Sequence, residues 1–304
     1  MTRRMVGILE ATCILPELTI VVPIHNISGA TSSLFSWVEE ALAVNVQVIL
    51  VHDLSTDDTG QLLRDFVDHK ATGLLSLIDV NAQSPGLARN AGLREVSTPW
   101  ISFADADDQL NIPNLLAMLK EARNSGSSIA IGSYTAENLI TRNVSKYDVP
   151  QTKIAENLAV SMGLWRCIFS KEILLETSFE SFRMAEDYLF LYEILNKTEN
   201  IYTCNLPVYK YFYGGKSNLT SVKSNMRDIL KVIGKIQSIQ PSNDLSANFK
   251  RIAIVKLYLS ALKNMEPHQS MAVLPKALFT FAKSPVSTLS TILLVRGLRG
   301  KNES

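Results

Sequence analysis

Carboxylates follow directly after two apolar, strand-like runs of the sequence. The run 100–104 leads into Asp105 and Asp107, and the run 46–51 leads through His52 into Asp53. A cluster of carboxylates repels itself unless it binds a cation or hydrogen-bond donors. Mg²⁺ and Mn²⁺ favour oxygen ligands and often share them with the phosphates of a substrate. We therefore expect Asp105 and Asp107 to serve metal and phosphate chemistry.

Two neighbouring polar segments have more than one interpretation. The segment 55–58, Ser-Thr-Asp-Asp, precedes a helical pattern, and we interpret it as helix capping rather than as part of a metal site. In the segment 84–92, Gly86 opens a helix and Arg89 follows one turn later. A helix N-terminus with a guanidinium suits an anion or the edge of a nucleotide, but an ordinary surface arginine would explain Arg89 equally well.

The elements that carry these residues alternate between strand and helix. Strand-like runs occur at 18–22, 46–51, 74–80, 100–104 and 128–131, and helical patterns occur at 34–44, 61–69, 86–96 and 112–123. This alternation predicts an α/β fold with a mostly parallel, doubly wound sheet covered by helices on both faces. Ligands of such sheets bind beyond the carboxyl ends of the strands, where the acidic residues lie. Because neither a G-x-G-x-x-G nor a G-x-x-x-x-G-K-[ST] motif is present, a dinucleotide-binding oxidoreductase and a P-loop NTPase are disfavoured.

Composition agrees with a folded intracellular protein. The chain has 304 residues, of which 46% are hydrophobic and 19% charged, so a mostly disordered chain is excluded. Its three cysteines, Cys13, Cys167 and Cys204, form no C-x-x-C motif and fit a reducing compartment. The first ten residues do not resemble a signal peptide, and we expect a cytoplasmic protein.

Four motifs in order carry a family resemblance. They are Thr19-Ile20-Val21-Val22-Pro23-Ile24-His25-Asn26, Asp53-Leu54-Ser55-Thr56-Asp57-Asp58-Thr59, Gly86-Leu87-Ala88-Arg89-Asn90-Ala91-Gly92 and Phe103-Ala104-Asp105-Ala106-Asp107-Asp108. In sequence and spacing this series resembles the family 2 glycosyltransferases of the GT-A fold, over roughly residues 18–220. The resemblance implies transfer of a sugar from a nucleotide diphosphate sugar, usually with inversion and with a divalent metal, Mn²⁺ or Mg²⁺.

The resemblance also implies roles for single residues on the donor side. By position, the nucleotide-binding residues are Pro23, Asn26, Asp53, Arg89 and Asp105, with Asp53 on the base edge, and Asp107 binds the metal. Two positions depart from the family pattern, since His25 replaces the usual Tyr and Leu54 replaces a Gly. Leucine resists the positive φ that glycine can adopt, so the backbone of that turn and the identity of the base stay open. For His25 and His52, a hydrogen-bonded structural role is preferred to metal binding.

On the acceptor side, the motif Ala185-Glu186-Asp187 at the start of a helix resembles the Glu-Asp motif of the family. By that match Asp187 is the catalytic base, which takes the proton of the acceptor hydroxyl, and Glu186 either orients the acceptor or caps the helix. Trp165, on a strand-like run 162–169 before a helix 171–176, faces the sugar or is simply a core residue. The family often has an Arg near the position of Tyr213, after the Tyr-rich strand 208–213; here Lys216 is the nearest cation, and the resemblance implies that it approaches the diphosphate.

Three functions follow from these features. The leading one is an inverting, metal-dependent hexosyltransferase in cell-surface polysaccharide biosynthesis, for which we expect a UDP-linked donor and a glycan or lipid-linked acceptor. One alternative is a non-catalytic nucleotide-sugar-binding homologue, which His25 and Leu54 make conceivable. The other is an Asp-x-Asp phosphotransferase, although Gln109 does not fit its motif. No nucleic-acid partner is expected.

The charge is divided unevenly along the chain. Residues 1–204 carry a net charge of −10 and residues 205–304 a net charge of +11. We predict a catalytic domain over residues 1–225 and a basic helical extension over 226–304, with helices at 226–239, at 245–263 and from Met271, the last interrupted by Pro275 and Pro285. This tail either binds an anionic membrane surface on the inner face or packs on the catalytic domain as a cap.

Overall fold

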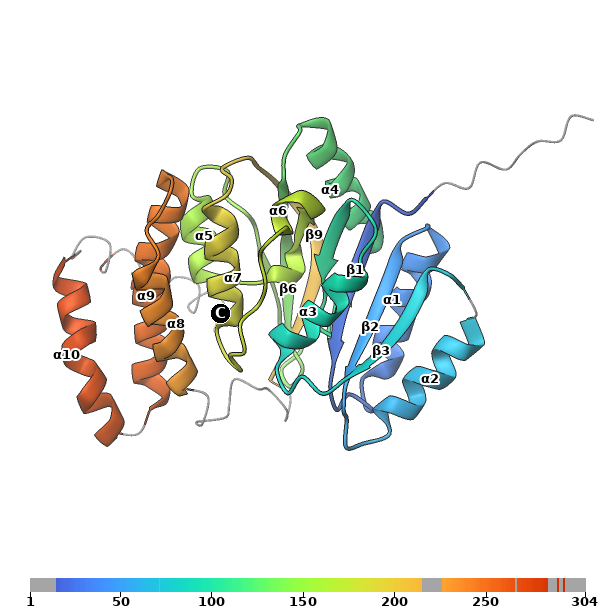
Figure 1. Cartoon of the computed structure of the whole chain (residues 1–304), viewed down its shortest axis with the longest axis horizontal. Helices are drawn as coiled ribbons and strands as arrows, with labels where there is room; N and C mark the ends of the chain where they lie inside the picture. The colour runs from blue at the N-terminus through green and yellow to red at the C-terminus, as the bar shows by residue number, and fades with distance from the viewer. Residues whose placement is uncertain are drawn as a thin grey trace, which may run out of the picture.

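A single nine-stranded sheet organises the molecule (Figure 1). The computed structural model describes residues 15–70, 72–214, 226–265 and 267–283, together with residues 289 and 292. The strands are β1 (Leu18–Ile24), β2 (Gln47–Asp53), β3 (Leu75–Val80), β4 (Trp100–Phe103), β5 (Gln109–Leu110), β6 (Ile129–Asn138), β7 (Val144–Tyr147), β8 (Cys167–Ser170) and β9 (Ile201–Tyr213). Their order in the sheet is β3-β2-β1-β4-β8-β6-β9-β5, and β7 pairs with β6.

The predicted α/β sheet is confirmed as mostly parallel. Strands β3, β2, β1 and β4 pair in parallel, and so do β6 and β9. Strand β8 runs antiparallel between β4 and β6, which leaves β6 in the direction of β4. The carboxyl ends of β1, β2 and β4, which carry Asn26, Asp53 and Asp105, therefore meet at one edge of the sheet.

Helices cover both faces of the sheet, because side chains alternate between its two sides. On one face, α1 (Thr31–Ala43) packs on β2, and α4 (Ile112–Asn124) packs on β6 and β9. On the other face, α3 (Pro85–Glu95) packs on β1 and β2 through Val21 and Val51. Helix α7 (Glu186–Leu195) lies on the same face over β4 and β8, where the Phe190 ring meets the edges of Phe103 and Phe169. The remaining helices are α2 (Thr59–Lys70), α5 (Ile154–Val160), α6 (Lys171–Leu174), α8 (Met226–Ser238), α9 (Asp244–Asn264) and α10 (Pro267–Lys283).

The strand-like run 162–169 is only partly a strand. Strand β8 begins at Cys167, and Trp165 lies in the preceding 3₁₀ turn η1 (Leu164–Arg166). The indole ring folds back over Gly163, where an added Cβ would come within 2.6 Å of it. The following helix, α6, also ends earlier than predicted, at Leu174.

The helices of the C-terminal extension begin and end close to their predicted positions. Helices α8 and α9 pack into the same core as α7, where the Phe249 ring stacks near Tyr192 at 6.3 Å and the Tyr192 hydroxyl donates to the Ile239 carbonyl. Helix α10 continues through Pro275, contrary to the predicted break. Pro275 is exposed, so its ring displaces no neighbouring helix. It still removes one hydrogen bond of the helix and crowds the carbonyl four residues before it, so α10 forms in spite of this proline.

Among these described helices, we find no segment with the length and apolar character that crossing a bilayer requires. The predicted domain boundary at residue 225 falls between described segments, and the predicted tail beyond residue 283 is almost entirely outside them.

Candidate active site

The loops that follow β1 and β2 are bonded to one another. Asn26 accepts a hydrogen bond at Oδ1 from the Thr56 backbone N–H (2.7 Å), and its own backbone N–H donates to Ser55 Oγ (3.0 Å). His25 donates from Nδ1 to the Asp53 carbonyl at 2.6 Å. The Asn26 side chain therefore shapes the predicted nucleotide loop. Pro23, half-buried within β1, lies in register with β2.

Asp53 and His52 fix the adjoining turns. Asp53 is buried and accepts at Oδ1 from the backbone N–H groups of Ala82 (2.7 Å) and Gln83 (3.1 Å), which shapes the loop before α3. His52 donates from Nδ1 to Asp79 (2.6 Å) and accepts at Nε2 from the Ser55 N–H (3.1 Å). The structural interpretation of both histidines agrees with these bonds.

The segment 55–58 also behaves as predicted, since Asp57 holds backbone groups. Its carboxylate accepts from the Thr59 N–H and the Ser28 N–H, both at 3.1 Å. What little burial Asp57 has would raise its pKa, but the hydrogen bonds from Thr59 and Ser28 prevail and lower it. Asp57 therefore stays charged and joins the start of α2 to the β1 loop.

Leu54 adopts the backbone conformation that the family pattern assigns to glycine. Its φ is +34°, and its side chain is 53% exposed. A left-handed backbone costs a non-glycine residue about 1–2 kcal/mol, so the turn forms with leucine at the expense of strain.

Replacing Leu54 by glycine is therefore expected to raise the free energy of unfolding by about 0.5–1 kcal/mol, the strain relief less the entropy that glycine loses on folding. Urea denaturation measures this difference. Leu175→Gly is the matched control, since Leu175 is 60% exposed at a φ of −57°, and it should lower stability. Equal losses in both variants would contradict the strain at Leu54.

Helix α3 holds the segment that leads into the Glu-Asp motif. Ser84 Oγ donates to the Phe182 carbonyl (3.0 Å), and Asn90 exchanges two hydrogen bonds with the Phe179 backbone (2.7 and 2.8 Å). A Cβ on Gly86 would lie 2.8 Å from Phe179 Cβ and 3.0 Å from Glu186 Cγ. Gly86 is thus required for close approach, and the 84–92 motif positions the start of α7.

Arg89 connects the end of β4 to the start of α7. Its guanidinium is buried and donates to Asp105 Oδ1 (2.8 Å) and to Glu186 Oε1 (3.1 Å). Burial acts to lower the pKa of Arg89, but the charges of Asp105, Glu186 and Asp187 prevail and raise it. Arg89 therefore stays charged and joins two motifs that are far apart in the sequence.

Asp187 lies in the first turn of α7, beside this ion-pair network. Ala185, the residue just before this helix, has a left-handed backbone with φ of +66°. Asp187 is half-buried and accepts at Oδ1 from the Tyr188 N–H (2.9 Å). Burial and the charge of Glu186 raise its pKa to about 7, against the opposing effect of Arg89. A carboxylate with such a pKa is suited to general base catalysis at neutral pH.

The three carboxylates after β4 differ in environment. Although the Asp107 side chain is exposed, nearby protein atoms partly desolvate its carboxylate. This desolvation, together with the charge of Asp105, raises the pKa of Asp107. Asp108 is buried and accepts from the Tyr209 hydroxyl and from the Phe212 N–H, both at 2.8 Å. Asp108 therefore fixes β9 to the site, while Asp107 faces solvent.

Tyr209 and Asp108 are site residues that the sequence interpretation missed. The buried Tyr209 hydroxyl accepts from the Asp105 N–H (3.1 Å) and donates to Asp108. The available signal was a third carboxylate directly after the Asp-x-Asp pair and a tyrosine repeated at every second position of 209–213.

Tyr209→Phe is expected to lower the free energy of unfolding by about 1–3 kcal/mol, because it leaves the buried Asp108 oxygen and the Asp105 N–H without this partner. Chemical denaturation gives the magnitude. Tyr202→Phe, on the same strand and only half-buried, serves as the control and should change stability little. Wild-type stability for Tyr209→Phe would contradict the role of this hydroxyl.

Trp165 belongs to an aromatic row rather than to an isolated core position. Its ring stacks on Tyr209 at 4.2 Å, lies parallel to Tyr211 at 6.0 Å and meets the edge of Tyr134 at 4.8 Å. Tyr211 is in turn parallel to Tyr213 at 6.3 Å. The row thus runs along β9 from Tyr209, whose hydroxyl is bonded to Asp108, to Tyr213.

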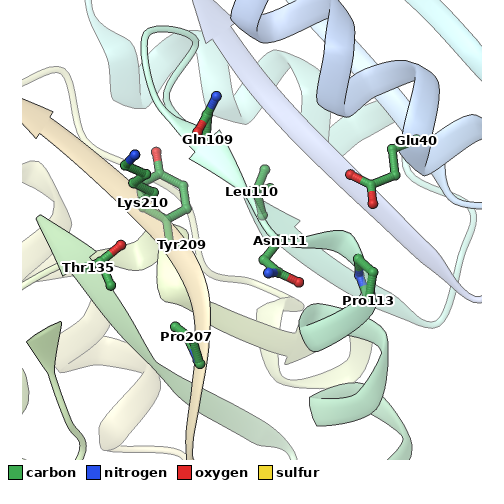
Figure 2. A pocket seen from close by; sticks show the side chains of 9 residues that line it. All are labelled: Glu40, Gln109, Leu110, Asn111, Pro113, Thr135, Pro207, Tyr209 and Lys210. Carbon is green, nitrogen blue, oxygen red and sulfur yellow. The ribbon is translucent and has the colours of Figure 1, made fainter. Parts of the chain in front are cut away.

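A shallow pocket of about 320 Å³ opens beside β5 and β9, on residues that Figure 2 labels. Tyr209, which lines this pocket, also bonds Asp105 and Asp108. Because Asp105, Asp107 and Asp187 do not line it, this pocket is not the candidate active site. Its lining residues are Glu40, Gln109, Leu110, Asn111, Pro113, Thr135, Pro207, Tyr209 and Lys210.

The predicted site residues are thus placed as follows. Arg89, Asp105, Glu186 and Asp187 form one network, and Asp107 adjoins it. Asn26 and Asp53 shape the neighbouring loops. Lys216 lies outside the described residues.

Comparison with known sequences decides the family. The sequence model described as "Glycosyl transferase family 2" matches residues 19–186, more than half of the chain. The chain belongs to glycosyl transferase family 2. The succinoglycan biosynthesis protein ExoO of Rhizobium meliloti (strain 1021) is 28% identical to it over 196 residues, which cover 58% of this chain and 55% of ExoO. The chain thus matches only about half the length of this relative from the family.

Solved structures confirm the GT-A fold of this family 2 chain. Residues 1–349 of S. aureus TarS, in complex with UDP-GlcNAc, superpose with a TM-score of 0.61 at 15% identity, over 93% of this chain and 92% of that one. The mannosyltransferase PcManGT of Pyrobaculum calidifontis, in complex with GDP-Man and Mn²⁺, superposes with a TM-score of 0.59 at 13% identity, over 93% and 88%.

Proposed function

We propose that the protein transfers a sugar from a nucleotide diphosphate sugar to a hydroxyl of a glycan or lipid-linked acceptor. We further propose that the transfer inverts the anomeric centre, depends on a divalent metal and serves cell-surface polysaccharide synthesis. The observation that carries the proposal is the buried Arg89 bridge between Asp105 at the end of β4 and Glu186 at the start of α7. Through this bridge the Asp105–Asp107 pair, which suits the donor, is joined to the Glu186–Asp187 motif, which suits the acceptor.

The comparisons support this choice of substrates. ExoO is named for succinoglycan biosynthesis, and TarP of Staphylococcus aureus, 24% identical over 168 residues, is named a poly(ribitol-phosphate) β-N-acetylglucosaminyltransferase. TarS is seen with UDP-GlcNAc and PcManGT with GDP-Man. A UDP-linked donor is the first choice, and GDP is the base to compare with it.

The chemistry assigned to the chain is a single displacement. The acceptor hydroxyl oxygen attacks the anomeric carbon, Asp187 takes the hydroxyl proton, and the bond from that carbon to the diphosphate oxygen breaks. Asp105 and Asp53 would contact the nucleotide, together with the loop that Pro23 and Asn26 shape. Arg89 holds Glu186, and with it the first turn of α7, at a fixed distance from the donor loop.

The acidic residues fit a divalent ion that is shared with the substrate. Asp107 and Asp105 offer hard carboxylate oxygens with partial solvent access. Within the described part of the chain, no group of three potential His, Cys, Asp or Glu ligands is assembled, so the diphosphate and water would complete the coordination of Mn²⁺ or Mg²⁺. Such an ion supplies charge that offsets the diphosphate leaving group.

Calorimetry with UDP tests the proposal directly. We expect UDP to bind, and Mn²⁺ to strengthen the binding, in the wild-type protein. A screen of nucleotide sugars by release of nucleoside diphosphate would then identify the donor. Absence of metal-linked affinity for both UDP and GDP would contradict the assignment. UDP binding with no turnover on any donor would favour a non-catalytic homologue.

Family membership and the bonding of Asp105 argue against the Asp-x-Asp phosphotransferase. That chemistry requires the first Asp as a free nucleophile, whereas Asp105 is ion-paired with Arg89 at 2.8 Å. The left-handed turn at Leu54 weakens one of the two reasons for a non-catalytic homologue, because the turn takes a positive φ without glycine.

A further inference from the structure

Helix α10 presents apolar side chains on two faces. On one face Val273 and Ala277 are buried against α9, and the Phe281 ring meets the edge of Tyr258 at 6.4 Å. The side chains on the other face are exposed. Met271 is 75% exposed, Leu274 44%, Leu278 55% and Phe279 63%. A helix that is apolar around most of its circumference is normally covered on most of it, so this second face calls for a partner.

The position of the helix leaves that face accessible. Figure 1 shows α10 as the outermost helix, beyond α8 and α9, at the end of the molecule away from α2 and β3. A contiguous group of exposed apolar side chains at such a place marks an interaction surface rather than the scatter found on any protein.

Positive charge surrounds the apolar face. Between residues 245 and 283 the sequence has six Lys and Arg and a single acidic residue, Glu266. Arg251, Lys276 and Lys283 are exposed, and none of them pairs with a carboxylate of the residues described here. Lys283 lies over the Phe279 ring at 4.4 Å, so cationic and apolar groups adjoin on the same helix.

Apolar and cationic side chains of these helices line a common cleft. It has a volume of about 390 Å³ and lies between α9, α10 and the end of α8. Ile254, Val255 and Phe279 form its apolar walls, and Lys250, Arg251 and Lys283 line it with positive charge. Lys250 is committed to the Gln237 and Ile239 carbonyls (3.1 and 2.6 Å). Arg251 donates one hydrogen bond to the neutral Asn248 side chain (3.0 Å), so its charge and that of Lys283 are available to an anion.

We propose that this α9–α10 face, defined by Leu274, Leu278, Phe279, Arg251 and Lys283, docks on the surface of a bilayer that contains anionic phospholipids. The exposed apolar side chains of α10 enter the boundary between headgroups and acyl chains, as interfacial helices do. The cations at the cleft contact headgroup phosphates, and each contributes about fivefold to binding. A second protein would also bury apolar groups, but the near absence of acidic residues on these helices favours an anionic surface.

This proposal narrows the sequence expectation, which assigned membrane binding to the tail 226–304 as a whole, to described residues of two helices. The described surface lies on α9 and α10, which pack on the core that carries the candidate active site, and it stands independently of the proposed function.

Co-sedimentation of the full-length protein with vesicles tests the surface. We expect the wild-type protein to pellet with phosphatidylcholine vesicles that contain phosphatidylglycerol, to stay in the supernatant with phosphatidylcholine alone, and to be released by high salt. The variant Leu274→Gln with Leu278→Gln should bind at least about tenfold more weakly, because two leucines no longer enter the bilayer. Arg251→Gln with Lys283→Gln should bind the anionic vesicles roughly 25-fold more weakly, because two cations no longer contact headgroup phosphates.

Matched controls come from the catalytic part of the chain. Ile140→Gln with Leu175→Gln removes apolar side chains that are 78% and 60% exposed, and Arg94→Gln with Lys120→Gln removes two exposed cations. Both should sediment as the wild type does, and all variants should keep the wild-type thermal unfolding curve.

In Phe279→Trp, tryptophan emission should shift to shorter wavelength on addition of the anionic vesicles.

Three results would overturn the proposal. The first is wild-type protein that stays in the supernatant with anionic vesicles at low salt. The second is binding that the α9–α10 variants and the control variants weaken equally. The third is a dimer that Leu274→Gln with Leu278→Gln dissociates while vesicles bind nothing, which would assign the face to contact between two copies of this chain.

Discussion

Asp107→Ala is expected to lower metal-dependent sugar transfer by about 10³-fold, because a metal ion that neutralises a leaving group is worth several kcal/mol. The fold should be unaffected. Asp107 is exposed, and its side chain makes no hydrogen bond to another of the described residues. Turnover measured with Mn²⁺ and with EDTA tests the loss of metal-dependent transfer, and the free energy of unfolding tests whether the fold is unaffected.

The neighbouring carboxylate makes this test specific. Asp108 is buried and holds Tyr209 and Phe212, so Asp108→Ala should lower stability by about 1–3 kcal/mol, whereas Asp107→Ala should not. Asp68→Ala, on the exposed side of α2, is the control for surface charge. Asp107 would not be a metal ligand if Asp107→Ala kept near-wild-type turnover in Mn²⁺, or if the wild-type protein turned over as fast in EDTA as in Mn²⁺.

The elements that could be predicted are those with a strong local signal. Strands β1, β2 and β4 are continuous apolar runs because both of their faces are buried, and the helices between them have apolar residues at helical spacing. Strands β5 and β7 have two and four residues, and they form because β9 and β6 offer them a partner. The turn at Trp165 depends on the ring packing over Gly163 and on Tyr209, which no local pattern contains.

The candidate site divides in the same way. The Asp105–Asp107 pair and the Glu186–Asp187 motif could be identified from residues next to one another. The role of Arg89 could not, because its partners lie 16 and 97 positions away in the sequence. The sequence showed a cation near a helix N-terminus and suggested an external anion, while the structure supplies internal carboxylates. Tyr209 escaped notice for the same reason, since Asp105 and Asp108 precede it by 104 and 101 positions.

Asp187→Asn is expected to lower turnover by at least about 10²-fold, the lower end of general base catalysis. Asparagine keeps the shape of the side chain and can still accept from the Tyr188 N–H, so the start of α7 should stay intact. Nucleotide affinity should change little, because Asp187 is assigned to the acceptor hydroxyl. Single-turnover rates and UDP calorimetry separate these effects.

Glu186→Gln is the matched control on the adjacent residue. Glu186 accepts from Arg89 at 3.1 Å, and glutamine keeps an acceptor oxygen for that bond, so its turnover should fall less than that of Asp187→Asn. Comparable losses in the two variants, or a loss of nucleotide affinity in Asp187→Asn, would assign Asp187 to binding or to structure.

The pH dependence gives an independent test of the same carboxylate. Burial and the charge of Glu186 raise the Asp187 pKa to about 7, so the base is protonated below that pH, and wild-type turnover should rise as the pH increases through it. The folded protein also holds this proton more tightly than the unfolded chain, whose Asp has an ordinary pKa of 3.8. The stability that Asp187 contributes is therefore complete below about pH 4 and is lost as the pH rises toward 7. Asp187→Asn should remove this loss together with the acidic limb of the turnover profile. A variant that kept the acidic limb would place the catalytic base on another residue.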